Sequence, residues 1–161
     1  MRLAGRIRGG LVPGVLLVVA CPGDDSSAGP EPLFPADYEA SYVEVRNCRG
    51  SGDHDLNNIR ILADPVALPY YQDRQGAFPE GAVVIKEEYD FGDTTCEGEL
   101  KQWTVMRKLA ADASPDTLDW EWQRVDEQRR VVGEDEMRCI SCHTGCGVPP
   151  DGFDWTCSIP P

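Results

Sequence analysis

The sequence predicts an α+β fold dominated by an antiparallel β-sheet, and three observations lead to this prediction. Segments rich in β-branched and aromatic residues recur along most of the chain, short turns separate them, and helical features are confined to two stretches near the start of the fold. Strands joined by short connections, with few helices, are typical of an α+β fold built around an antiparallel sheet. No internal repeat is visible.

The two early stretches predict short helices. The first follows Pro35 and carries apolar side chains at one helical face, namely Tyr38, Tyr42 and Val45. The second begins at Asp64, a favourable N-cap residue that is followed by proline, and is expected to run towards Gln75 and end at Gly76.

Four segments predict the strands. They cover residues 59–62, 82–86, 102–108 and 118–125. Turn residues lie between the last two, around Ser114-Pro115-Asp116. Aromatic and aliphatic side chains alternate along 118–125, so one face of that strand must be covered by a core or by a large flat ligand.

The amino terminus predicts export. Three arginines precede an apolar run from Leu11 to Ala20 that is too short to span a bilayer. Val18-Val19-Ala20 before Cys21 has the form of a bacterial lipoprotein cleavage site, so residues 1–20 are read as a signal peptide and Cys21 as the lipidated first residue. The protein is then expected on the periplasmic face of the outer membrane. The alternative is an ordinary signal peptide with Cys21 free or bridged.

One domain is expected after this segment. Residues 21–33 are polar and rich in Gly, Pro and Ser, which predicts a flexible tether, and residues 34–161 form the domain. The net charge of −13 becomes −16 on cleavage, because three arginines and no acidic residue are removed. Such a charge argues against nucleic acid and anionic membrane surfaces as partners; it suits solubility, or the steering of a cationic partner.

The chemistry is carried by Cys139-Ile140-Ser141-Cys142-His143. Two thiols at this spacing can add to the vinyl groups of one haem, while the adjacent imidazole binds the iron. The motif therefore predicts one covalently attached haem c on Cys139 and Cys142, with His143 as the metal ligand. The alternatives are a disulfide loop or half of a zinc site, and zinc would need further ligands from His54 or other cysteines.

Four further cysteines predict two disulfides in an exported chain. Three pairings are open to Cys48, Cys96, Cys146 and Cys157. We expect Cys146 to pair with Cys157, which closes the short tail after the haem motif, and Cys48 to pair with Cys96.

Other stretches also carry a likeness to known proteins: Ile59-Arg60 through Asp64-Pro65, then Tyr70, Phe78 and Gly81, the segment Val83 to Glu87, and Trp120 to Asp126. Together with the haem motif they resemble the cytochrome P-460 family over roughly residues 35–143. The resemblance implies a largely β domain that holds a c-type haem near its carboxy terminus, with His143 as the proximal ligand.

The resemblance also implies an activity. Members of that family carry a lysine bonded to the porphyrin edge, which corresponds to Lys86 here, and oxidise hydroxylamine at an open iron site. The related β-type cytochromes c′ bind gases such as nitric oxide and lack the lysine, so Lys86 favours the first group. The expected function is therefore an oxidoreductase acting on hydroxylamine or nitric oxide with an electron-transfer partner; the alternatives are a gas-binding haem protein and a simple electron carrier. Family members are often homodimers.

Some features of the site stay open in the sequence. Family members use a distal carboxylate, for which Glu87, Glu88 and Glu99 are all candidates. Lys86 shares a strand face with Val84. His54 lies in a polar loop and is expected to face solvent, and Met106 is expected to fill the core rather than bind iron.

Overall fold

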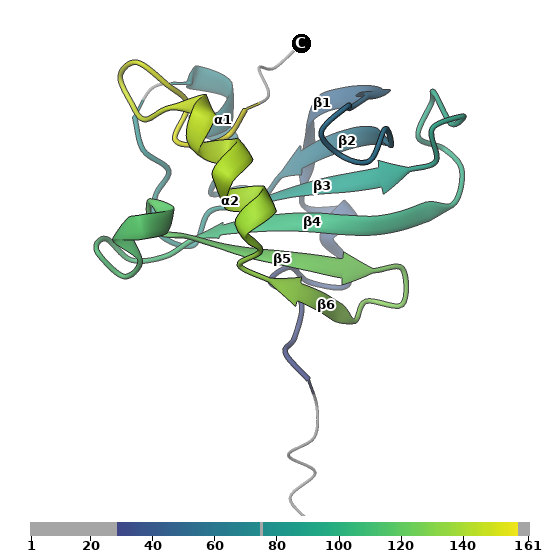
Figure 1. Cartoon of the computed structure of the whole chain (residues 1–161), viewed down its shortest axis with the longest axis horizontal. Helices are drawn as coiled ribbons and strands as arrows, with labels where there is room; N and C mark the ends of the chain where they lie inside the picture. The colour runs from purple at the N-terminus through teal and green to yellow at the C-terminus, as the bar shows by residue number, and fades with distance from the viewer. Residues whose placement is uncertain (1–28, 75, 158–161) are drawn as a thin grey trace, which may run out of the picture.

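A computed structural model describes residues 29–74 and 76–157, and its centre is one antiparallel sheet (Figure 1). Six strands lie in chain order, from β1 to β6, each paired antiparallel with the next. They are β1 (Val43–Gly50), β2 (Asn58–Ala63), β3 (Val83–Tyr89), β4 (Leu100–Lys108), β5 (Trp120–Asp126) and β6 (Val131–Glu134). The α+β prediction is confirmed.

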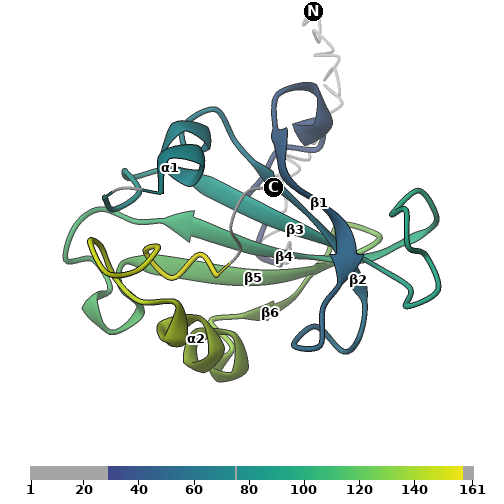
Figure 2. The ribbon, with the colours of Figure 1, turned by 90° about the horizontal axis from the view of Figure 1, so that it is seen from above.

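Helices are few and short, and they connect or follow the strands. Within the described residues, the α-helices are α1 (Leu68–Asp73) and α2 (Met137–His143), and the 3-10 turns are η1 (Tyr38–Ala40), η2 (Pro115–Thr117) and η3 (Thr144–Cys146). Figure 2 shows α1, α2 and the carboxy-terminal tail lying over the sheet, with α1 and α2 towards its two edges. No helix among the described residues is long and apolar enough to cross a membrane.

The sheet has an apolar core on each face. One core contains Val84, Met106 and Trp122 from the strands, packed against Tyr71 of α1 and Ile140 of α2. The opposite core is built around other strand residues, and the segment before β1 covers it through side chains that include Phe34 and Tyr38. Alternation along each strand produces these two faces, because successive side chains point to opposite sides.

The predicted strands are confirmed, but the first predicted helix is wrong. Only the turn η1 forms there, and Val45 lies in β1, where it is buried. Apolar residues at three- and four-residue spacing fit a helix, yet pairing of β1 with β2 satisfies the backbone of this segment instead.

The second predicted helix begins later than expected. The Asp64 carboxylate accepts the Ala67 N–H at 2.7 Å and the Asp64 carbonyl accepts the Leu68 N–H at 2.9 Å, so Asp64 caps a turn that precedes α1. The helix then ends at Arg74, whose φ of 55° is left-handed. Strand β6 and helix α2 were not predicted.

Both expected disulfides are present. Cys48 pairs with Cys96 and Cys146 pairs with Cys157, at Cα–Cα distances of 5.6 and 4.9 Å. The first joins β1 to the loop between β3 and β4, and the second folds the tail back onto α2 and η3. The predicted signal peptide, Cys21 and most of the tether lie outside the described residues.

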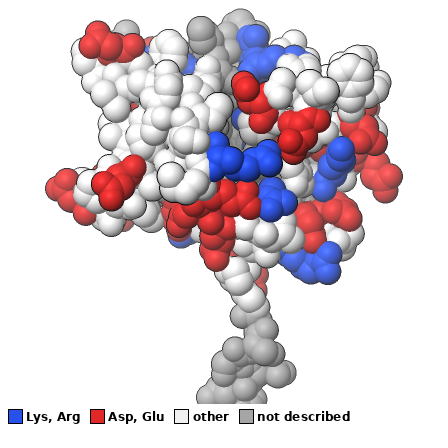
Figure 3. All heavy atoms as spheres, in the orientation of Figure 1, with Lys and Arg blue, Asp and Glu red and all other residues white. Residues whose placement is uncertain are grey.

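Charged side chains are mixed on the face shown in Figure 3. Acidic and basic groups lie next to each other over much of this face, whereas the part over α2 and the tail is largely uncharged. The net negative charge is therefore not gathered into one acidic patch on this face.

Candidate functional site

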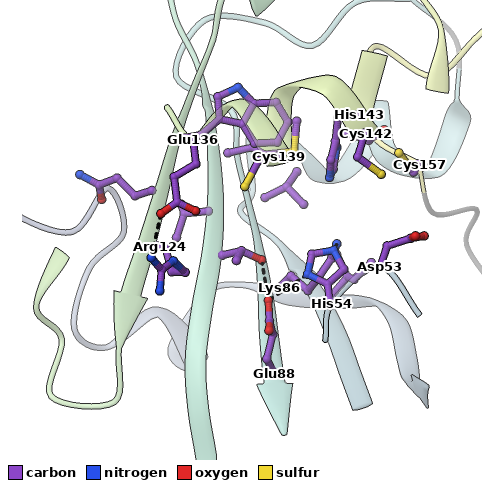
Figure 4. A pocket seen from close by; sticks show the side chains of 18 of the residues that line it. Asp53, His54, Lys86, Glu88, Arg124, Glu136, Cys139, Cys142, His143 and Cys157 are labelled. Atoms are coloured by element: carbon purple, nitrogen blue, oxygen red, sulfur yellow. Dashed lines mark hydrogen bonds and ion pairs between the residues drawn. The ribbon is translucent and has the colours of Figure 1, made fainter. Parts of the chain in front are cut away.

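A pocket lies between α2 and the sheet, and the two sides contribute different chemistry (Figure 4). Helix α2 presents Cys139, Cys142 and His143 to it, while β3 and the β1–β2 loop present Lys86, Glu88 and His54 from the opposite side. Apolar strand residues, including Val84 and Trp122, line the space between them. The structure thus brings Lys86 and the Cys-x-x-Cys-His motif to one site.

The two motif cysteines are free thiols. Cys139 is partly buried and Cys142 is exposed. Burial raises the pKa of the Cys139 thiol, so it is held in its protonated form at neutral pH. Between them, Ile140 is buried in the core and fixes the rotation of α2, which turns both sulfurs towards the pocket.

His143 is oriented by the tail and by β5. Its Nδ1 lies 2.7 Å from the Trp155 carbonyl oxygen, and its ring packs edge-on against Trp122 at 4.7 Å between centroids. A carbonyl only accepts, so Nδ1 carries the proton and Nε2 keeps its lone pair. Burial, aided by the positive charge of Lys86, lowers the pKa of His143 to about 4, which keeps the imidazole neutral and able to bind a metal.

Lys86 lies on the pocket face of β3. Val84 shares that face, while Val83 and Ile85 belong to the opposite core, as the alternation predicts. Its Nζ lies 2.6 Å from Nε2 of His54. Loss of water around the ammonium lowers the pKa of Lys86 to about 8, although the nearby acidic groups oppose this shift. The Lys86 ammonium therefore loses its proton more easily than that of an ordinary lysine, although it stays mostly protonated near neutral pH.

Glu88 is the buried carboxylate of the pocket, which Asp53 and Glu136 also line. It is 1% exposed and accepts hydrogen bonds from side chains on two segments, the β1–β2 loop and β4: His54 (3.0 Å), Asn57 (3.0 Å), Gln102 (2.8 Å) and Thr104 (3.3 Å). Burial alone would raise its pKa, but the hydrogen bonds outweigh burial and hold the pKa of Glu88 below its ordinary value. Glu88 is therefore ionised.

The other two candidate carboxylates lie elsewhere. Glu87 is on the opposite face of β3, where it bonds Tyr38 at 2.5 Å and Arg60 at 2.6 Å, and Glu99 is exposed. Of the three carboxylates left open by the sequence, only Glu88 lines the pocket.

His54 was expected to face solvent, and this expectation is wrong. Its side chain is only 18% exposed and lies between Lys86 and Glu88. The polar β1–β2 loop closes on itself through hydrogen bonds from Ser51 N–H to the Asn57 carbonyl and from Asn57 N–H to the His54 carbonyl, so the loop folds over β3. Polarity of the local sequence does not reveal this, because the partners of His54 come from another strand.

Sequence reasoning named Glu88 as one of three candidate carboxylates without choosing it, although Glu88 is two residues after Lys86 and must share its strand face. It missed the Trp155 carbonyl, whose position depends on how the tail folds. Met106 lies in the core next to the pocket, in agreement with its expected role as core residue.

The pocket fits a haem by the chemistry of its donors. One neutral imidazole and two unpaired thiols reach the pocket from the same helix, and among the described residues no group of three or more His, Cys, Asp and Glu side chains is arranged to hold a metal ion. Trp122 also contributes a buried Nε1–H that has no hydrogen-bond partner within the described part of the chain. Such a donor suits an acceptor on a bound molecule, for example a haem propionate.

This arrangement is that of a haem-binding protein. The model of one protein family, Cytochrome P460, matches residues 35–147, a range that includes all six strands and α2. The chain therefore belongs to the cytochrome P460 family, and membership implies that it binds haem. No curated protein matches the sequence.

Proposed function

We propose that this protein is a mono-haem c-type cytochrome and an oxidoreductase that acts on hydroxylamine or nitric oxide at an open iron. The observation that carries the proposal is the position of Lys86. It lies in the same pocket as Cys139, Cys142 and His143, on the side that faces α2. A partly buried lysine among apolar strand residues costs stability, which favours a functional role for it. Lys86 corresponds to the lysine that distinguishes the hydroxylamine-oxidising members of the family.

Three residues of the chain would hold the haem. Cys139 and Cys142 would form thioethers to it, and His143 would bind its iron through Nε2, the nitrogen left without a proton by the Trp155 bond. The haem would supply the redox chemistry. Both ring nitrogens of His54 are already engaged, with Lys86 and Glu88, so His54 does not compete for the iron. This supports an iron site open to substrate rather than a simple electron carrier.

Glu88 would act on the protons of the substrate. Oxidation of hydroxylamine releases protons with its electrons, and an ionised carboxylate inside the pocket can accept them. Glu88 is buried and ionised, and it lines the same pocket as the motif. The electrons would leave to a separate electron-transfer partner.

Export and lipid anchoring are also proposed. The two disulfides support an oxidising compartment outside the cytoplasm. The form of the sequence before Cys21 supports lipidation there. Replacing Cys21 by serine should move the protein from the membrane fraction to the soluble fraction of the periplasm, and an already soluble wild type would contradict the anchor.

The function is tested by Lys86→Ala. The protein is matured with a cytochrome c assembly system, and absorption spectra and hydroxylamine oxidation are compared with wild type. We expect the thioethers to form, the Soret band to move and hydroxylamine oxidation to fall at least a hundredfold. Arg130→Ala is the control, because Arg130 lies between β5 and β6 and outside the pocket, with its side chain 71% exposed. Identical spectra for Lys86→Ala and wild type would favour the gas-binding alternative.

A further inference from the structure

His54 is held between two groups of opposite charge. Its Nδ1 lies 3.0 Å from Oε1 of Glu88, and its Nε2 lies 2.6 Å from Nζ of Lys86. Glu88 is ionised and can only accept, so Nδ1 carries a proton that it donates to Glu88. The remaining nitrogen, Nε2, therefore shares a single proton with the Lys86 amine.

We propose that Glu88, His54 and Lys86 form a proton-transfer triad in which His54 takes the proton of the Lys86 ammonium and frees its amine to bond to the haem edge. The inference rests on the proposed function, because it explains how the lysine would become nucleophilic. The proton moves from Nζ to Nε2, and the imidazolium that results is stabilised by the negative Glu88. The order of carboxylate, imidazole and nucleophile is that of a serine hydrolase triad, with an amine in place of the hydroxyl.

The bond-forming step balances with one oxidant. A bond forms between Nζ and a porphyrin edge carbon, and one N–H bond and one C–H bond break. Two protons and two electrons leave in this exchange. A peroxide is a suitable class of oxidant, because hydrogen peroxide takes up both protons and both electrons and becomes two waters. His54 acts before this exchange, by removing the extra proton of the ammonium.

Other groups near Lys86 are less suited to this task. The acidic and thiol groups that face it are Glu88, Asp53, Cys139 and Cys142. Glu88 reaches it through His54, and both cysteines would be consumed as thioethers. Within the described part of the chain, Lys86 Nζ makes its hydrogen bond to Nε2 of His54. His54 is therefore the group placed to take the proton.

The test compares His54→Gln with wild type. Glutamine can still accept a hydrogen bond from Lys86 but cannot take up a proton, so the variant separates proton transfer from positioning. Both proteins are matured with haem, treated with hydrogen peroxide and digested. Mass spectrometry then measures the fraction in which the Lys86 peptide stays joined to the Cys139–His143 peptide through haem. In wild type we expect the Lys86 peptide to be linked through haem to the Cys139–His143 peptide. In His54→Gln the linked fraction should be at least tenfold lower, with the thioethers intact in both proteins.

Further variants sharpen the result. Glu88→Gln should also lower the fraction of linked Lys86 peptide, because a neutral amide does not stabilise the His54 imidazolium. Asp55→Asn is the matched control from the same loop, with its side chain 68% exposed, and should join as wild type does. Haem-bearing His54→Gln that joins at the wild-type rate would overturn the triad and leave the proposed function standing. Wild type that carries haem but shows no joined peptide would overturn the Lys86 assignment and the triad together.

Discussion

At the scale of single residues, the site places three ionisable groups in unusual states. His143 and Lys86 both have pKa values lowered by burial, to about 4 and about 8, and Glu88 has a lowered pKa because hydrogen bonds outweigh burial. Near neutral pH the His143 imidazole is therefore neutral and able to bind a metal, the Glu88 carboxylate is ionised, and the Lys86 ammonium loses its proton more easily than that of an ordinary lysine. Perturbed groups of this kind concentrate at functional sites.

Burial of Lys86 predicts a pH-dependent cost to stability. The folded pKa of about 8 lies below the unfolded value of about 10.5. Between these values the unfolded chain binds more protons, so the free energy of unfolding rises with pH, by at most about 1.4 kcal/mol per pH unit. The full cost is present below about pH 8. Lys86→Met should therefore stabilise the protein most at pH 7–8 and progressively less towards pH 10.

The measurement is urea unfolding of haem-free protein in a Cys139→Ser/Cys142→Ser background. Arg130→Gln serves as control and should change stability by less than about 1 kcal/mol with no trend between pH 7 and 10, because its side chain is 71% exposed and arginine stays charged over this range. A Lys86→Met gain that stays constant with pH would show that Lys86 is an ordinary solvated lysine.

At the scale of elements, the carboxy-terminal tail positions the proximal histidine. Trp155 supplies the carbonyl for His143, and the preceding residue, Asp154, anchors the tail. The Asp154 carboxylate lies 3.0 Å from Lys108 Nζ and accepts the Phe78 N–H, and the Asp154 carbonyl accepts Trp120 Nε1–H. The Cys146–Cys157 disulfide joins the tail, just beyond Trp155, to η3.

Asp154→Asn should be strongly destabilising. It removes one partner of a buried ion pair, since Lys108 is 7% exposed and Asp154 is 1% exposed. Loss of one partner in such a pair costs about 3–5 kcal/mol, because the other charge stays buried. Urea unfolding measures the loss. Arg130→Gln, which removes an exposed ion pair with Asp126, is the control and should cost less than about 1 kcal/mol. Equal effects of the two variants would contradict an anchoring role for Asp154.

The elements also show what the sequence could predict. Strands β2 to β5 carry local signals, namely alternating or β-branched runs, and these predictions are confirmed. The haem motif carries a fixed cysteine spacing, and the haem attachment that this spacing indicates stays a prediction. Val45 lies at a spacing from Tyr38 and Tyr42 that also fits a helix. Its segment forms strand β1 instead, because the backbone pairs with β2. The same limit applies to the site: the strand face of Lys86 follows from period-two alternation, whereas the approach of His54 depends on a loop that folds over another strand.

At the scale of the whole molecule, the sheet is a platform with one functional face. The segment before β1 covers one side with an apolar core, and α1, α2 and the tail cover the other. The pocket lies on this second face, between α2 and the strands. Rigid neighbours on both sides hold the motif and Lys86 in fixed positions, which suits a site that binds a large planar group.

The central claim is that Cys139 and Cys142 carry one haem, and the intact mass of the denatured, matured protein tests it most directly. The account predicts the mass of the polypeptide plus one haem, with the haem retained after extraction with acidic acetone, because thioether bonds survive that treatment. Cys139→Ser/Cys142→Ser should lose the added mass. An unmodified polypeptide mass for the wild type, after expression with the maturation machinery, would contradict the account.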